Sequence, residues 1–99
     1  MRIYEHKTTM LVSGGSISTV TLSIAGGLFR YMYVQTATSS TIFRANLKDE
    51  DGDSIMDWGF QTGSLRDGGF AVPVLGRHTF QITNASQTDT FKIKLRVEE

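Results

Sequence analysis

The C-terminal quarter of the chain alternates apolar and polar residues with a period of two. The apolar positions are Phe91, Ile93, Leu95 and Val97, and the basic positions between them are Lys92, Lys94 and Arg96. This alternation is typical of a strand with one buried and one solvated face. Phe80 and Ile82 repeat the pattern, and the polar stretch 84–89 separates the two runs. We therefore predict a β-hairpin over residues 77 to 98.

The same period-two pattern recurs along most of the chain. It predicts further strands at residues 10–12, 20–24, 28–36, 43–47, 56–60 and 70–74, with glycine-rich or polar turns between them. No segment has apolar residues at helical spacing over the length that a helix needs. About eight short strands without crossover helices indicate an all-β fold, a single antiparallel β-sandwich of jelly-roll type. Pro73, the only proline, predicts that its strand lies at a sheet edge or is bulged.

Length and composition point to one domain and to association. The 99 residues fit a single domain over 1–99, because either half alone would bury too small a core. Residues 1–13 are either the first strand or an extended N-terminal arm. Without cysteine, stability must come from burial or from contacts with other copies. The first residues contain no apolar run of the kind that a signal peptide or membrane span needs, which predicts synthesis in the cytoplasm and no membrane partner.

The predicted strand 28–36 is apolar on both faces, and only Arg30 within it is charged. A small sandwich needs one apolar inward face, so we predict that a subunit interface covers the second. Ile42 and Ile55 also lie on otherwise polar faces of their strands. The expected interface residues are Leu28, Arg30, Met32, Val34, Ile42 and Ile55.

The charge balance argues against nucleic acid as a partner. Ten Lys and Arg residues balance ten Asp and Glu residues, whereas proteins that bind by neutralising phosphates are typically basic. The basic stripe in the last strand is interpreted as a solvated face that prevents edge-to-edge aggregation.

One acidic segment offers a candidate metal site. Asp49, Asp51 and Asp53 alternate around Gly52, and alternate carboxylates on such a loop can converge on a hard cation such as calcium. The spacing does not match a helix–loop–helix calcium loop, which needs its glycine one position later and a terminal glutamate. We favour a hairpin turn of the primed type at Asp51-Gly52, with no cofactor required and calcium as the alternative.

Aromatic residues and histidines are further candidates for binding and catalysis. Trp58, and separately Tyr31 and Tyr33, can form platforms that stack on sugar rings, although aromatics at alternate strand positions more often pack in the core. His6 and His78 lie near no nucleophile motif and have no metal-ligand spacing. We therefore predict that the chain is not an enzyme.

The C-terminal hairpin carries a resemblance to known families. Residues 76–84, GRHTFQITN, and residues 91–95, FKIKL, resemble the last two strands of small jelly-roll modules. Such hairpins occur in carbohydrate-binding modules and in the decoration (cement) proteins of tailed bacteriophage capsids, and the short stand-alone chain favours the second family. That resemblance implies a virion protein that forms a homo-oligomer, typically a trimer, and binds the major capsid protein. The alternative is a glycan-binding module that uses Trp58 or a tyrosine.

Overall fold

The computed structural model describes residues 3–69 and 71–98, with residues 21–26 and 75 described by their backbone alone. They form seven β-strands: β1 (Ile3–Val12), β2 (Ser18–Thr36), β3 (Ile42–Lys48), β4 (Ser54–Thr62), β5 (Ser64–Asp67), β6 (Val72–Thr83) and β7 (Asp89–Glu98). None of the described segments is a helix long and apolar enough to cross a membrane.

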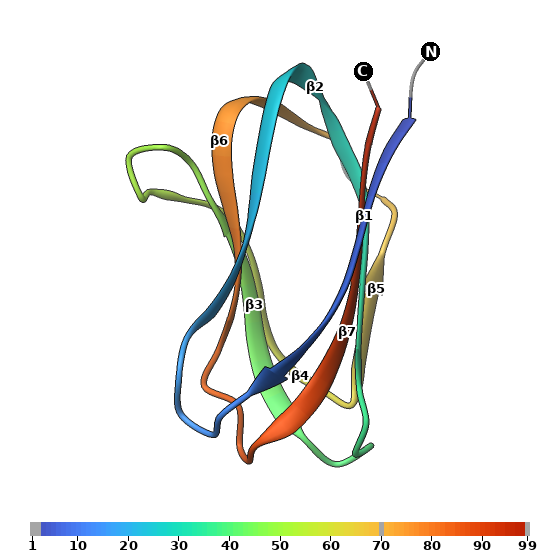
Figure 1. Cartoon of the computed structure of the whole chain (residues 1–99), viewed down its shortest axis with the longest axis vertical. Helices are drawn as coiled ribbons and strands as arrows, with labels where there is room; N and C mark the ends of the chain where they lie inside the picture. The colour runs from blue at the N-terminus through green and yellow to red at the C-terminus, as the bar shows by residue number, and fades with distance from the viewer. Residues whose placement is uncertain (1–2, 70, 99) are drawn as a thin grey trace.

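The strands pack as two antiparallel sheets that share β2 (Figure 1). The first, here called the β1 sheet, has the order β1-β7-β2-β5. The second, the β4 sheet, has the order β2-β6-β3-β4. The β-sandwich predicted from the alternating pattern is therefore confirmed. Pro73 pairs with Leu28 on β2, in a part of β6 that has no pairing to β3, which agrees with the edge position expected for proline.

Strand β2 crosses from one sheet to the other. Its pairing with β6 changes register between Ile24 and Gly27 and ends at Phe29, and from Leu28 onward β2 also pairs with β7. The sequence pattern predicted two separate strands here, at 20–24 and 28–36. The glycine pair interrupts the alternation and shifts the register, but the strand continues through it, so one 19-residue strand serves both sheets.

A second register shift in β2, between Phe29 and Tyr31, reverses which residues face the core. Because one extra residue is inserted, Phe29 faces inward before the shift, and Met32 and Val34 face inward after it. Met32 and Val34 are 0% exposed, so the prediction that they contact another subunit is wrong. The two-sided apolar pattern of residues 28–36 reflects this β-bulge and not a second apolar face.

The core lies between the two sheets, and phenylalanines are its largest buried side chains. The largest fully buried side chains include Phe29, Phe43, Phe80 and Phe91. The rings of Phe43 on β3 and Phe91 on β7 meet edge to face, with centroids 5.3 Å apart. Such a pair adds about 1 kcal/mol to the burial of its rings and joins the two sheets directly.

A buried carboxylate closes one end of the sandwich. Asp89, at the start of β7, is only 7% exposed. Its Oδ2 accepts hydrogen bonds from Oγ1 of Thr41 at 2.7 Å and the backbone N–H of Thr38 at 3.0 Å. The Thr41 hydroxyl, followed by the N–H groups of Thr38 and Thr90, lowers the pKa of Asp89 although burial opposes this. The connection between β2 and β3 is thereby tied to β7.

Candidate docking surfaces

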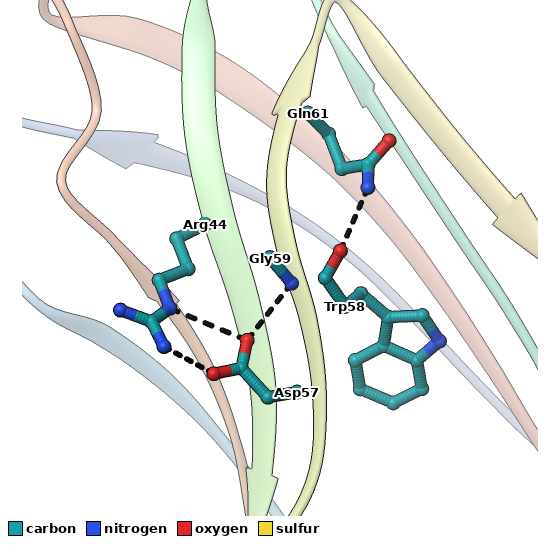
Figure 2. Close-up of polar contacts among 5 residues, drawn as sticks. All are labelled: Arg44, Asp57, Trp58, Gly59 and Gln61. Atoms are coloured by element: carbon teal, nitrogen blue, oxygen red, sulfur yellow. Dashed lines mark hydrogen bonds and ion pairs between the residues drawn. The ribbon is translucent and has the colours of Figure 1, made fainter.

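Strand β4 is an edge of its sheet, and two β-bulges distort it. Its pairing with β3 leaves Ile55 and Trp58 without opposite residues. The second bulge places Gly59 at a φ of 70°, a conformation that favours glycine. The Gly59 N–H donates to Oδ1 of Asp57 at 2.8 Å, as Figure 2 shows. Bulges of this kind twist an edge and hinder pairing with another strand.

An ion pair across the outer face of β3 and β4 holds the second bulge in place. Arg44 donates to both carboxylate oxygens of Asp57 through its Nε and Nη2 atoms (Figure 2). Arg44, followed by the Gly59 N–H, lowers the pKa of Asp57, and the carboxylate raises the pKa of Arg44. The guanidinium also lies 5.8 Å from the ring centroid of Phe60, which is 61% exposed.

Trp58, the predicted sugar platform, is turned toward the core. Its ring lies 6.4 Å from Phe29 and 5.8 Å from Phe80, measured between centroids. The indole Nε1–H donates to Oδ2 of Asp67 at 2.9 Å. The backbone carbonyl of Trp58 accepts from Nε2 of Gln61 at 2.8 Å (Figure 2). The indole therefore anchors β4 and β5 to the core and is not free to stack on a sugar.

Strand β1 is also a sheet edge, but unlike β4 it is regular. It pairs with β7 over ten consecutive residues without a register shift, and β7 is its only partner among the described strands. Three apolar side chains along it are exposed: Ile3 at 56%, Tyr4 at 45% and Leu11 at 70%. A long regular edge with apolar side chains can pair with a further strand. Sequence reasoning left this segment open between an arm and a first strand, and its pairing makes it the border strand of the β1 sheet.

The outer face of the β1 sheet gathers cations from three strands. The pairing places Lys7, Lys94, Tyr33 and Arg66 in one row across the sheet, with Lys94 between Lys7 and Tyr33. Lys92 and Arg96 flank Lys94 on the same face of β7. We call this surface the basic face and define it by Lys7, Arg66, Lys92, Lys94 and Arg96. Only the three residues on β7 form a stripe that the sequence pattern indicates, because Lys7 and Arg66 join them through strand order.

The two tyrosines that were predicted to bind sugar belong to this basic face. The guanidinium carbon of Arg96 lies 5.0 Å from the ring centroid of Tyr31, and that of Arg66 lies 4.7 Å from that of Tyr33. Tyr33 also donates its hydroxyl proton to Oε1 of Gln35 at 2.8 Å. The rings therefore hold arginine side chains in place by cation–π contact.

The remaining predicted interface residues lie in separate places. Leu28 and Arg30 are exposed on β2, where Arg30 Nη1 bonds Glu98 Oε2 at 3.0 Å. Ile42 is exposed on β3 and Ile55 in the first bulge of β4. These four side chains do not form one continuous patch.

The acidic segment forms the hairpin between β3 and β4. The N–H of Gly52 donates to the Asp49 carbonyl at 3.1 Å, and the N–H of Asp49 donates to the Asp53 carbonyl at 3.0 Å. Only Gly52 in this hairpin has a positive φ, 84°. The turn is thus a three-residue loop ending on a left-handed glycine, and the prediction of a two-residue primed turn is wrong.

Ligand oxygens of Asp49, Asp51 and Asp53 lie within 4.8 Å of one another. This is close enough for a hard cation, but Asp49 Oδ1 already accepts the N–H groups of Asp51 at 2.9 Å and Asp53 at 3.0 Å. These hydrogen bonds form the turn itself, so the convergence of the carboxylates needs no ion.

Comparison with known proteins identifies the fold but no family. No protein-family model matches the chain, and no curated protein matches its sequence. Among solved structures, the Bacillus endospore appendages, described as disulfide-linked pili, are 13% identical, with 97% of this chain and 88% of that one covered and a TM-score of 0.52.

Two other solved structures share the fold. The Aeromonas hydrophila periplasmic inhibitor of g-type lysozyme is 17% identical, with 95% and 84% of the two chains covered and a TM-score of 0.53. A protein in the structure of the Gx strain of infectious bursal disease virus is 15% identical, with a TM-score of 0.50, and the match covers 97% of this chain but 31% of the viral one. At these identities the likeness concerns the β-sandwich alone.

Proposed function

We propose that this chain is a non-enzymatic structural protein of a virion, a capsid decoration protein that associates with copies of itself and with the shell. The observation that carries the proposal is the regular, unpaired edge of β1. Along ten residues it offers backbone N–H and C=O groups on one side, together with the exposed side chains of Ile3, Tyr4 and Leu11. Strand addition to such an edge supplies main-chain hydrogen bonds and buries apolar surface at once.

Two further observations support an assembly protein. The β-sandwich is a fold that also occurs in structures of a pilus and a viral capsid, which are assembled from many subunits. The C-terminal hairpin resembles the phage decoration proteins. The chain has no cysteine, so its assembly would rest on strand pairing and surface contacts and not on the disulfides named for the endospore pili.

The glycan-binding alternative has less support. Trp58 has its indole N–H bonded to Asp67 and its ring against the core, and Tyr31 and Tyr33 each hold an arginine over the ring. A sugar platform needs a free aromatic face, and none of these three side chains offers one without rearrangement.

Light scattering of the purified protein tests the proposal. We expect a stable homo-oligomer, and we expect Ile3→Ser/Leu11→Ser to weaken association by about two orders of magnitude, because two apolar side chains lose their burial. The control Ile42→Ser/Phe60→Ser removes two other exposed apolar side chains, from the β4 sheet, and should leave the mass unchanged. A wild-type protein that stays monomeric at high concentration would overturn the assembly function.

The mass of the oligomer also shows whether β1 pairs with β1 of another copy or with a different surface. Pairing of β1 with β1 of another copy is symmetric and gives a dimer, whereas the trimer that the resemblance implies needs β1 to meet a different surface. Antibody labelling of intact particles tests the virion location: label on the shell supports decoration, and label confined to soluble cell extract contradicts it.

A further inference from the structure

The charges of this chain cancel in number but not in position. The formal net charge is zero, yet the basic face carries five of the ten Lys and Arg side chains. Two carboxylates share this face among the described residues: Glu5 on β1, and Glu98, which follows Arg96 on the same face of β7 and bonds Arg30. Four of the ten acidic residues lie instead in the hairpin between β3 and β4: Asp49, Glu50, Asp51 and Asp53. Figure 1 shows this hairpin projecting on one side of the molecule and strands β1 and β7 on the other.

The basic face holds like charges close together. Lys94 has Lys7 opposite it on β1, and Lys92 and Arg96 are two residues away on the same face of β7. Glu5 pairs with Lys7 at 3.4 Å and Arg96 at 3.5 Å. Lys92 and Lys94 have no ion pair among the described residues, and they border a shallow hollow of about 280 Å³ together with Lys7 and Thr9. Carboxylates of a partner entering this hollow would relieve the repulsion.

The acidic hairpin is fixed in shape and projects its charges outward. Asp49 bridges the turn with its carboxylate, and Oε1 of Glu50 accepts the Arg77 N–H at 2.9 Å, which ties the hairpin to β6. Asp51 and Asp53 are exposed, and their side chains have no ion pair among the described residues. Two carboxylates are thus presented on a preorganised loop, so little conformational freedom is lost when they bind.

We infer that the basic face of one copy binds the 49–53 hairpin of a second copy. This inference rests on the proposed function, in which the chain associates with itself, and it names a second contact besides the β1 edge. Charge indicates which partner binds the basic face. The unpaired cations and the unpaired carboxylates lie on opposite sides of one chain, so they can meet only between two copies. A contact between two different surfaces is heterologous and joins copies head to tail. Because the groups are exposed, the contact weakens as salt rises.

Reciprocal charge reversal tests the contact. Lys92→Glu/Lys94→Glu reverses the charge of the two cations of the basic face that have no ion pair, and Asp51→Lys/Asp53→Lys reverses the two exposed carboxylates of the hairpin. At low salt we expect each variant alone to associate at least about tenfold more weakly than wild type, because the two pairs of side chains that meet across the contact then carry like charge. An equimolar mixture should recover the wild-type mass, since each variant matches the other. The control Thr19→Glu/Thr83→Glu places two carboxylates on the β4 sheet and should associate like wild type.

The outcomes separate this inference from the proposed function. A mixture that stays dissociated, or single variants that keep the wild-type mass, would overturn the head-to-tail contact while leaving assembly through β1 standing. A wild-type protein that stays monomeric at low salt would overturn both. Binding of poly-L-glutamate to the basic face of a protein that shows no salt-sensitive association would assign the face to a foreign polyanion and overturn the second copy as its occupant.

Discussion

Strands β1 and β4 are both sheet edges, and they differ in the regularity of their pairing and in the packing of their side chains. β4 has two bulges, the ion pair between Arg44 and Asp57 on its outer face, and an indole that reaches the core. β1 keeps one register for ten residues, and Val12, at its end, is its only fully buried side chain. Side-chain contacts attach β4 to the sandwich, whereas β1 is attached mainly by its backbone pairing with β7. An edge built like β4 resists further strands, and an edge built like β1 is open to them.

The largest difference between the two edges should appear when their anchoring side chains are truncated. Trp58→Ala removes an indole packed against Phe29 and Phe80 and the hydrogen bond to Asp67, and we expect a loss of about 3 kcal/mol in the free energy of unfolding. Met10→Ala on β1 removes a half-buried side chain and should cost about half as much. Urea denaturation measures both, and equal losses would contradict the view that β4 depends more on its side chains.

Two glycines, Gly59 in β4 and Gly63 directly after it, give a smaller and graded effect. Gly59 and Gly63 both have left-handed φ values, 70° and 76°, but an added Cβ meets no atom within 4 Å at Gly59 and lies 2.5 Å from the Ser39 carbonyl oxygen at Gly63. We expect Gly59→Ala to cost about 1 kcal/mol for the backbone alone and Gly63→Ala clearly more. A Gly59→Ala loss as large as that of Gly63→Ala would show that the bulge is more tightly enclosed than the structure indicates.

The smallest effect concerns acid sensitivity. The pKa of Asp89 is lowered by the Thr41 hydroxyl and two backbone N–H groups, so its contribution is complete above the ordinary Asp value of 3.8 and is lost as pH falls through the lower folded value. We expect Asp89→Asn to be less stable than wild type near about pH 7 and to lose less on acidification.

The matched substitution on β4 is Asp57→Asn. Its carboxylate also has a lowered pKa, through Arg44 and the Gly59 N–H, but it is exposed to water and salt. The difference in urea midpoint between variant and wild type, measured across the acid range, should therefore be smaller for Asp57→Asn than for Asp89→Asn. A larger effect of Asp57→Asn than of Asp89→Asn would contradict the larger contribution to stability that we assign to the buried carboxylate.

The strands could be predicted from the sequence because side chains alternate across a half-buried strand. The hairpin over 77–98 and the β-sandwich follow from that rule alone. The same rule failed in β2, where an inserted residue turned Met32 and Val34 inward and Tyr31 outward. A bulge shifts the alternation by one residue without a distinctive residue type at its position, so pattern reasoning interpreted it as a second apolar face.

The candidate surfaces were less predictable because they depend on strand order. Lys7 lies beside Lys94 only because β1 pairs with β7, and these residues are far apart in sequence. Trp58 and Tyr33 were recognised as aromatic candidates, but their contacts with Asp67 and Arg66 come from β5, a four-residue strand that the pattern did not reveal. The acidic hairpin was located correctly, since its residues are contiguous.

Amide hydrogen exchange in β1 at low and high protein concentration is the most direct test of the central claim, that β1 is the edge used for assembly. When the oligomer forms, we expect the β1 amides that point away from β7 to exchange more slowly, because a new strand accepts their hydrogen bonds. The amides of β4 should exchange at the same rate at both concentrations. Slower exchange in β4 with no change in β1 would contradict this account of the two edges.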